Sequence, residues 1–375
     1  MKNFTVIIIG GGPAGAMCGI ELQRAGVSTC IFDKDAFPRD KLCGGLLTQK
    51  TVDLLTGYCP EIRPDEYVVK ETDSVEFSYR SEPVISFRTE LPLYLTERTV
   101  LDDRLIKLYQ KLGGTVFENA MIRSHHIDPE SNTINLDTGT YRYDVLVGAY
   151  GCRSLLARLY SIDLDHCFCI EGTADKNSPE KTVKIHFGHV RGGYGWDFPK
   201  KDHFTIGTLE ETKGIRISDS FFRDTIKKDV HSIRGALIPS GQRIMLKKLR
   251  QNVLLIGDAA GFTDPITGEG IYYAIMSGKL AADSIRNTIQ TGDYKYRDAY
   301  LQSIRKIRKN ISAAYFLKSI LYNPFVLKHF MRFIRKHRSF ALFYIEEIVS
   351  QYKYGYRNFV WHYLRERFGY GKHWE

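Results

Sequence analysis

Short apolar runs near the N-terminus are each followed by a turn or by a helix-forming segment. The run at 4–9 leads into a glycine-rich loop at 10–15 and then into an apolar segment at 16–24. A second β-branched run at 27–32 ends at Asp33. Apolar runs of this length bounded by glycine are typical of buried strands. Strand, helix and strand in this order predict a parallel sheet of the α/β class.

The glycine loop has the spacing of a dinucleotide-binding turn. Gly10 permits the tight turn, Gly12 lets the backbone approach a pyrophosphate, and Gly15 allows close packing of helix on strand. Asp33 follows at the distance expected for a carboxylate that accepts the ribose hydroxyls. The helix N-terminus supplies amide donors to the anion. The predicted cofactor-binding residues of this segment are Gly10, Gly12, Pro13, Ala14, Gly15 and Asp33.

A second glycine-rich segment decides which dinucleotide is expected. A predicted strand at 252–256 ends near Asp258, and a turn leads to a helical pattern at 271–283. An Asp at a strand end can receive a ribityl hydroxyl, and the free amides of a helix start favour the negative edge of a reduced flavin. Two such segments fit one FAD better than NAD, although a capping Asp in an ordinary turn is the alternative. The predicted contacts here are Asp258, Pro265, Gly268, Gly270 and Ile271.

The middle of the chain alternates between apolar and polar residues like half-buried strands. Such segments lie at 74–79, 84–88 and 182–187, and a hairpin is predicted at 194–209. We expect one antiparallel sheet that roofs the cofactor. The predicted fold class is α/β, with a Rossmann-type FAD-binding domain, an interleaved antiparallel-sheet substrate domain and a helical C-terminal region. The expected boundaries are 1–74, 98–160 and 250–290 for the FAD-binding domain, 75–97 and 161–249 for the sheet domain, and 291–375 for the C-terminal region.

Two further motifs complete a family resemblance. The segment 37–46 reads FPRDKLCGGL, and the segment 194–200 reads YGWDFPK. With the two flavin motifs they resemble the geranylgeranyl reductase family, within the para-hydroxybenzoate hydroxylase-like folds, over residues 1–290. The resemblance implies that 37–46 runs along the isoalloxazine and that an arginine at position 98 contacts FAD. The predicted cofactor set therefore also includes Lys34, Arg39, Cys43, Gly44, Gly45, Arg98 and Ile122.

The same motifs supply the candidates for catalysis and substrate binding. Cys43 lies near two cations and could be a reactive thiol, or a small buried apolar group. Tyr194, Trp196 and Phe198 alternate on one face of a strand, either as a cavity wall or as ordinary sheet core. For Arg98, which precedes a helical pattern at 100–112, a solvated surface position is the alternative. The candidate catalytic residues are Cys43, Tyr194 and Trp196, and the candidate substrate-binding residues are Tyr194, Trp196 and Phe198.

One position departs from the family pattern. After the apolar strand at 145–149, Tyr150 stands where relatives commonly carry Asp. In many hydroxylases that Asp helps to organise FAD and the approach of pyridine nucleotide. Direct reduction by NADPH is therefore in doubt, and NAD(P)H, ferredoxin or a separate reductase are all expected as alternative electron donors.

Cysteine usage and hydropathy bear on location. The seven cysteines form no C-x-x-C pair, which favours a reduced, metal-free, cytoplasmic protein. We expect neither a signal peptide nor a transmembrane helix, because the early apolar run is short and later ones are interrupted by charge.

The C-terminal region carries the basic excess of the chain. Residues 293–375 contain 17 Lys and Arg against six Asp and Glu, and 21 of the 47 aromatic residues. Such a surface suits peripheral contact with the inner face of an anionic membrane. Packing on the other domains with a solvated basic face is the alternative. Nucleic-acid binding is not expected, since no binding motif accompanies the charge.

The leading hypothesis is an FAD-dependent oxidoreductase that reduces C=C bonds of an isoprenoid lipid by hydride transfer. One alternative is a flavin monooxygenase of the aromatic hydroxylase or halogenase type, although the halogenase pattern Trp-x-Trp-x-Ile-Pro is absent from the sequence. A second alternative is a membrane-docked flavin electron carrier to quinone.

Overall fold

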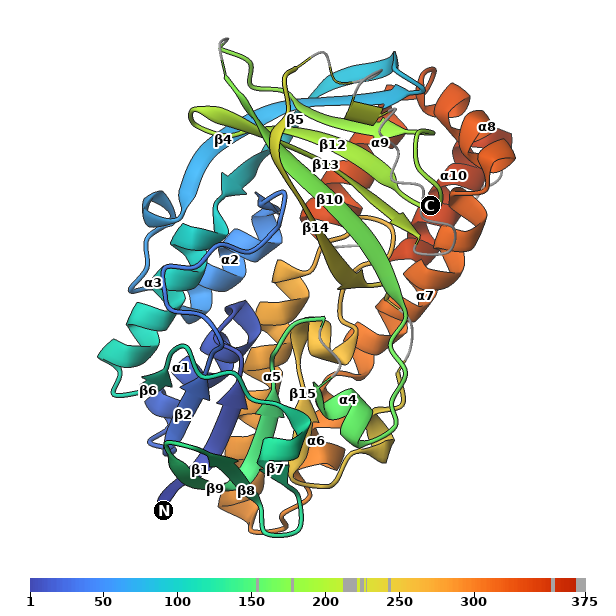
Figure 1. Ribbon diagram of the computed structural model, residues 1–375. Helices are drawn as coiled ribbons and strands as arrows, with labels where there is room; N and C mark the ends of the chain where they lie inside the picture. The colour runs from blue at the N-terminus through green and yellow to red at the C-terminus, as the bar shows by residue number, and fades with distance from the viewer. Residues whose placement is uncertain are drawn as a thin grey trace.

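The protein is built around two β-sheets with helices between and beside them (Figure 1). The computed structural model describes residues 1–152, 155–176, 179–211, 221–222, 226, 228–241, 244–351 and 355–368. The predicted α/β class, with its Rossmann-type part and its helical C-terminal region, is confirmed. Arg153 and Ser154, the end of the segment around Tyr150, lie outside the described residues.

The first sheet forms the lower lobe in Figure 1. Strands β1, β2, β6, β9 and β15 run parallel, and β7 and β8 extend the sheet in antiparallel fashion. The parallel strands pack in one apolar core with α1, α3 and α5, so the β-branched residues at 6–9 and 29–32 are buried. The predicted strands 4–9, 27–32 and 252–256 are confirmed. The bounds are β1 (Lys2–Ile9), β2 (Thr29–Phe32), β6 (Thr115–Phe117), β7 (Ile127–Asp128), β8 (Thr133–Leu136), β9 (Gly139–Gly148) and β15 (Val253–Leu255).

The second sheet, which we call the roof sheet, lies above the first. Its order is β14, β10, β13, β12, β11, β4, β5, β3, and the predicted hairpin is confirmed as β12 paired with β13. The expectation of a purely antiparallel sheet is wrong, since β11 pairs with β4 in parallel. The chain leaves β5 for the lower lobe, returns to the roof sheet at β10 and then enters β11 at the other edge of β4, and a long crossover of this kind allows parallel pairing. The bounds are β3 (Leu46–Leu47), β4 (Val68–Tyr79), β5 (Glu82–Thr96), β10 (His166–Asp175), β11 (Val183–Phe187), β12 (Tyr194–Pro199), β13 (His203–Glu211) and β14 (His231–Pro239).

Helices connect and cover these sheets. The predicted helices at 16–24, 100–112 and 271–283 correspond to α1, α3 and α5. The α-helices are α1 (Pro13–Arg24), α2 (Gln49–Tyr58), α3 (Arg98–Lys111), α4 (Leu155–Leu159), α5 (Ile271–Thr291), α6 (Tyr296–Ser303), α7 (Arg305–Leu321), α8 (Pro324–Ile334), α9 (Arg338–Phe343) and α10 (Tyr356–Phe368). The π-helix η6 spans Tyr344–Ser350, and short 3-10 turns are η1 (Pro64–Glu66), η2 (Ser124–His126), η4 (Leu246–Lys248) and η5 (Gly257–Ala260). No helix in the described ranges is both long and apolar enough to cross a membrane.

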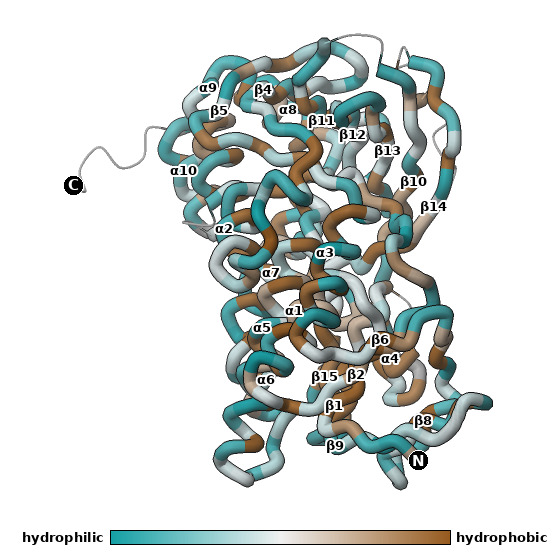
Figure 2. The backbone as a smooth tube through the Cα atoms, turned by 90° about the vertical axis from the view of Figure 1, so that its left-hand side faces the viewer, coloured by the Kyte–Doolittle hydropathy of each residue, from teal (hydrophilic) through white to brown (hydrophobic). Residues whose placement is uncertain are grey.

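Two large apolar cores hold the lobes together, and a third, smaller one lies around Phe204 and Ile206. The first joins the parallel sheet to α1, α3 and α5, where Figure 2 shows the apolar strands β1 and β15 inside the lobe. The second lies between the roof sheet and the C-terminal helices, and it brings Val75 and Leu95 together with Leu327, Met331 and Phe340. Packing against the roof sheet therefore explains the apolar residues on the inner face of the C-terminal helices.

Candidate functional site

The glycine loop between β1 and α1 leaves its backbone open on one side. A Cβ atom at Gly15 would lie 1.9 Å from the carbonyl oxygen of Gly10. Gly10 itself has a φ of 106°, which favours glycine, so side chains are excluded from the turn at both positions. A Cβ atom at Gly12 would meet only the guanidinium groups of Arg39 and Arg98, at 3.4 and 3.8 Å. Two cations and the start of α1 thus face the same open backbone, which suits a pyrophosphate.

A buried ionic cluster holds these arginines in place. Arg98 donates to both carboxylate oxygens of Asp102, at 2.7 Å each, and Arg39 contacts Asp102 at 3.2 Å and Asp33 at 3.5 Å. The Gly11 N–H donates to Asp33 at 2.7 Å. The alternative of a solvated Arg98 is wrong, because the residue is buried. Asp102, one helical turn beyond Arg98, was not predicted from the sequence. The Arg-x-x-x-Asp spacing, which places the two side chains on one face of a helix, could have indicated this ion pair.

The second glycine-rich segment, which leads into α5, lies beside the glycine loop. Asp258 accepts a hydrogen bond from Thr263 at 3.1 Å and lies 3.4 Å from the Lys41 ammonium. A Cβ atom at Gly270 would contact the Asp258 carboxylate at 3.3 Å, so the start of α5 and this carboxylate share one narrow space. Thr263 and Lys41 were not predicted as site residues.

The loop that carries Cys43 is held from both sides. The Cys43 N–H donates to Glu171 Oε1 at 3.2 Å, and the buried Lys200 ammonium donates to the carbonyls of Gly44 and Thr96 at 2.7 Å each. The Gly45 N–H donates to Cys43 Sγ at 3.4 Å. Glu171 and Lys200 were not predicted as site residues, although Glu171 is a charge within the apolar strand β10 and Lys200 directly follows β12. We call the group formed by Cys43, Gly44, Gly45, Glu171 and Lys200 the loop clamp.

Burial changes the ionisation of both charged members of the loop clamp. Burial raises the pKa of Glu171 to about 7, and only the Cys43 amide and the more distant Lys200 and Arg234 charges oppose this shift. Burial lowers the pKa of Lys200 to about 8. The second oxygen of Glu171 has no hydrogen-bond partner among the described residues. The clamp therefore contains a carboxyl group that can hold or release a proton near neutral pH.

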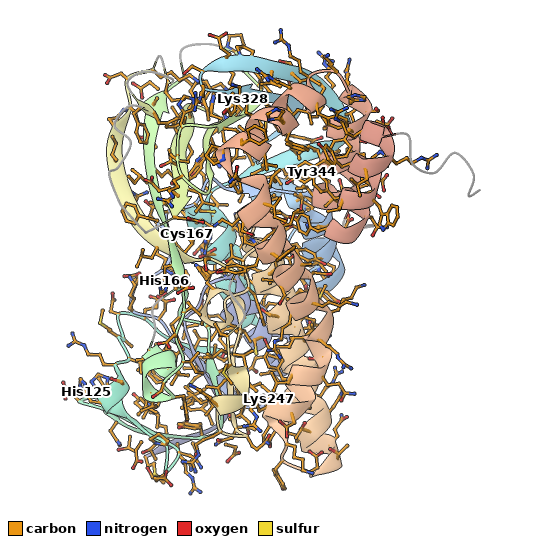
Figure 3. All side chains as sticks on the ribbon, turned by 90° about the vertical axis from the view of Figure 1, so that its right-hand side faces the viewer. His125, His166, Cys167, Lys247, Lys328 and Tyr344 are labelled. Carbon is orange, nitrogen blue, oxygen red and sulfur yellow. The ribbon has the colours of Figure 1, made fainter. Side chains whose placement is uncertain are left out.

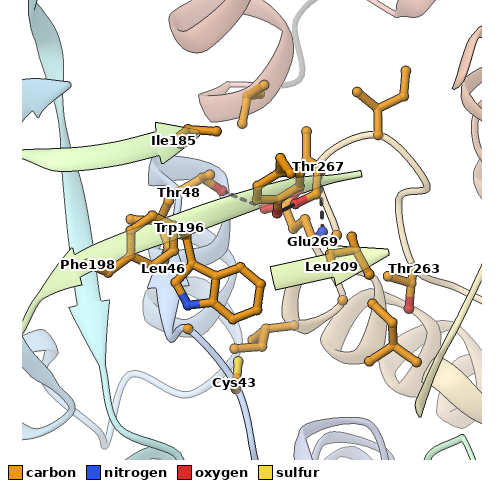
Figure 4. Close-up of a pocket in the computed structure, with 18 of the residues that line it drawn as sticks. Cys43, Leu46, Thr48, Ile185, Trp196, Phe198, Leu209, Thr263, Thr267 and Glu269 are labelled. Atoms are coloured by element: carbon orange, nitrogen blue, oxygen red, sulfur yellow. Dashed lines mark hydrogen bonds between the residues drawn. The ribbon is translucent and has the colours of Figure 1, made fainter. Parts of the chain in front are cut away.

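A large apolar cavity opens from this loop into the interior (Figure 4). Gly12, Ala14, Lys41, Arg98 and Asp258 border it at the cofactor end. The roof sheet adds apolar walls, including Val75, Phe77, Leu93, Ile185 and Leu209. Helices α7 to α10 and η6 close the other end through Leu321, Tyr322, Leu327, Phe330, Met331, Ile334, Phe340, Ala341, Tyr344, Ile345, Val349 and Phe359. This contribution of the C-terminal helices to the cavity was not predicted.

The three aromatic residues of β12 all line the cavity. Trp196 and Phe198 face Gly44, where a Cβ atom would lie 3.0 Å from Phe198 and 3.3 Å from Trp196 Nε1. The Tyr194 hydroxyl donates to the Thr267 carbonyl in the loop before α5, and burial raises its pKa. Trp196 and Phe198 also belong to the second apolar core, with Tyr194 packed against it, so the three residues combine the cavity-wall and sheet-core positions.

Two hydrogen bonds attach the C-terminal helices to this loop. The Tyr322 hydroxyl donates to the Ile266 carbonyl at 2.9 Å, and the Tyr356 hydroxyl donates to Asp264 at 2.8 Å. The loop before α5 is therefore held by the roof sheet on one side and by the helices on the other.

The remaining predicted residues occupy different places. Cys43, Gly44, Gly45, Gly268, Gly270, Ile271 and Pro13 line the cavity. Lys34 is half-exposed beside Asp35, Ile122 is buried in the first core, and Pro265 packs near Gly241. The Tyr150 hydroxyl accepts the N–H of Leu156 at 3.0 Å, so it caps the turn into α4.

These features fit an extended FAD. Gly12, Arg39 and Arg98 would hold the pyrophosphate, and Asp258 with the start of α5 would hold the ribityl and flavin end. The cavity beside Gly44, Trp196 and Phe198 leaves space for a flat ring next to a backbone without side chains.

Comparisons with known proteins agree with this geometry. The FAD binding domain family matches residues 3–166. An uncharacterized protein of Methanosarcina barkeri is 29% identical over 334 residues, which span 86% of this chain and 84% of that protein. The geranylgeranyl diphosphate reductase of Synechocystis sp. is 27% identical over 353 residues, or 85% of this chain and 84% of that enzyme.

A solved structure shows the same fold. The geranylgeranyl bacteriochlorophyll reductase-like protein of Thermoplasma acidophilum superposes with a TM-score of 0.79 at 20% identity, over 90% of this chain and 92% of that one. Fold and site together define an FAD-dependent oxidoreductase with a para-hydroxybenzoate hydroxylase-like fold. Over most of its length the chain is similar in sequence to geranylgeranyl diphosphate reductases.

The ionisation of Glu171 makes stability depend on pH. The pKa of Glu171 in the folded state, about 7, lies above the ordinary value of 4.5. The contribution of Glu171 to the free energy of unfolding is therefore complete below pH 4.5, and it is lost as the pH rises through about 7. Ionisation of this buried carboxyl group lowers the free energy of unfolding by about 3 kcal/mol. Glu171→Gln keeps an acceptor for the Cys43 amide without this cost. We expect the melting temperature of the variant to exceed that of wild type at pH 8 and to match it near pH 5.

The measurement is thermal unfolding of the holoenzyme across this pH range. Glu82→Gln, at an exposed position on β5, is the matched control and should leave the pH profile unchanged. Parallel profiles for wild type and Glu171→Gln would contradict the assignment of the titrating group.

Proposed function

We propose that the protein reduces carbon–carbon double bonds of an isoprenoid lipid. The cavity is the observation that carries this proposal. Among the described residues that line it, the charged ones are Lys41, Arg98 and Asp258, at the cofactor end, and Glu269, which is paired with Lys50 at 2.6 Å. The rest of the wall is predominantly aliphatic and aromatic, which suits a long hydrocarbon chain.

The residues of the cavity act by positioning and by excluding water. Reduced FAD, when bound, would supply a hydride to one alkene carbon, and the other carbon would take a proton that comes from solvent. An isolated alkene offers no polar group for a hydrogen bond, so catalysis depends on holding one bond of the chain against the reactive face. Trp196 and Phe198 pack the substrate toward Gly44, and the apolar walls keep water away from the reaction.

The role of Tyr194 in this proposal is structural. Its hydroxyl hydrogen is directed at the Thr267 carbonyl, so it fixes the loop that leads into α5 and does not point a proton at the substrate. We therefore assign this candidate catalytic residue a positioning role.

The test is incubation of dithionite-reduced holoenzyme with a geranylgeranyl lipid, followed by mass spectrometry. We expect products heavier by pairs of hydrogens. Oxygenated or halogenated products in air would indicate a monooxygenase or halogenase instead. Rapid oxidation of the flavin by quinone analogues without change in the lipid would indicate an electron carrier, and either result would overturn the proposal.

A cavity variant sharpens this test. Ala341 of α9 is buried and lines the helical end of the cavity, so Ala341→Phe should shorten the space for the chain. We expect turnover of a geranylgeranyl lipid to fall about tenfold or more, while a short prenyl compound is still reduced. Ala313→Phe on α7, which does not line the cavity, is the control. Equal loss for both substrates would contradict the placement of the chain.

We also propose that the enzyme meets its lipid at a membrane surface. The exposed charge of the C-terminal helices supports this contact.

A further inference from the structure

Helix α8 is the wall between the cavity and the outside. Its inner face, formed by Leu327, Phe330, Met331 and Ile334 at helical spacing, lines the cavity. Its outer face carries exposed residues, among them Phe325, Lys328 and Arg332. A ligand at the outer face of α8 is therefore separated from the cavity by the thickness of a single helix.

The outer face continues onto the end of α7 as an apolar patch. Phe325 is 71% exposed, Phe316 is 70% exposed, and Ile320, one turn beyond Phe316, is 44% exposed. Asn323 caps α8 by accepting the N–H groups of Phe325 and Val326, so the corner between the two helices has a fixed start. Large apolar side chains gathered at one exposed corner mark an interaction site.

Cations surround this patch without acidic partners. The sequence contains no Asp or Glu between Asp298 and Glu346. Lys328 and Arg332 on α8 and Lys336 just after it are exposed, and within the described ranges none of them forms an ion pair. Figure 3 shows Lys328 at the upper end of the molecule, beside the C-terminal helices. We call Phe316, Ile320, Phe325, Lys328, Arg332 and Lys336 the docking face.

We infer that the docking face rests on an anionic lipid bilayer and that the isoprenoid tail passes beside α8 into the cavity. The inference rests on the proposed function, because it names the surface from which that lipid arrives. Aromatic rings can enter the boundary between headgroups and acyl chains while lysine and arginine reach the phosphates. The charge complementarity and the apolar inner face of the same helix favour a lipid surface over a second copy of this chain.

The experiment is sedimentation of the full-length holoenzyme with vesicles. We expect binding to phosphatidylcholine vesicles that contain phosphatidylglycerol, and weaker binding to phosphatidylcholine alone or at high salt. Lys328→Glu/Arg332→Glu and Phe316→Ser/Phe325→Ser should each lower the partition coefficient about tenfold or more. Both variants should keep their activity on a detergent-solubilised substrate and lose it on the same lipid in vesicles.

Matched variants elsewhere test the location of the surface. Lys111→Glu/Lys247→Glu makes the same charge change on the lower lobe, where Figure 3 shows Lys247, and Leu237→Ser removes an exposed apolar residue from β14. These controls should bind vesicles like wild type. Equal loss in the controls, unchanged binding of the docking-face variants, or a wild-type dimer that dissociates in Phe316→Ser/Phe325→Ser would each overturn the inference. Vesicle binding without any alkene reduction would overturn the proposed function and leave the docking face intact.

Discussion

Gly12→Val is expected to yield a folded protein that no longer binds FAD. Gly12 has a φ of −70° and ψ of −178°, which any residue can adopt, and a Cβ atom there meets only the ends of Arg39 and Arg98. The protein can therefore accept the side chain. The pyrophosphate cannot, because valine would occupy the open backbone that it must approach. Flavin absorbance of the purified protein should be lost, while its melting temperature should match that of the wild-type apoprotein.

Variants at two other glycines serve as controls for this prediction. Gly57 on α2 has no atom within 4 Å of an added Cβ, so Gly57→Val should keep the flavin. At Gly15 the added atom would lie 1.9 Å from a backbone oxygen, so Gly15→Val should fail to fold. Retention of FAD by Gly12→Val would show that the pyrophosphate lies elsewhere.

Lys200→Met is expected to loosen the loop clamp. Lys200 donates to the carbonyls of Gly44 and Thr96, and methionine would leave both acceptors without this partner in a buried place. We expect a loss of about 2–4 kcal/mol in the free energy of unfolding, reduced somewhat by the removal of a buried charge. FAD affinity and turnover should both fall about tenfold or more, since the loop that faces Trp196 and Phe198 loses its support.

The measurements are chemical denaturation, flavin titration and steady-state rates. Lys201→Met makes the same chemical change at the adjacent exposed position and should alter stability by less than about 0.5 kcal/mol. If Lys200→Met lowers stability but leaves FAD affinity and turnover unchanged, Lys200 supports only the roof sheet and not the cofactor loop.

Local sequence patterns indicated the glycine turns and Asp258 in the cofactor half of the site. Gly10, Gly12 and Gly15 occupy a turn in which each has a distinct steric task, and such a task can be fulfilled by few other residues. Asp258 and the start of α5 likewise lie in one short segment, only 13 residues apart. The strands that carry these motifs have apolar runs long enough to be recognised.

Contacts between distant segments could not be predicted in this way. Glu171 and Cys43 lie 128 residues apart, and Lys200 and Gly44 lie 156 apart. The parallel pairing of β11 with β4 also depends on where the chain returns after crossing the lower lobe. No local pattern predicts a contact between such distant residues, because the sequence around either residue is the same as that of an ordinary strand or loop.

The sequence alone determined the class of fold, the FAD motifs and the family resemblance, because these depend on residues that are neighbours along the chain. Only the tertiary structure decided what the basic, aromatic C-terminal region does with its two faces. Helix α8 turns Leu327, Phe330, Met331 and Ile334 into the cavity and leaves Phe325 and its neighbouring cations outside. Which face meets the cavity depends on packing against the roof sheet, and hydrophobic burial sets that orientation only when the whole chain is folded.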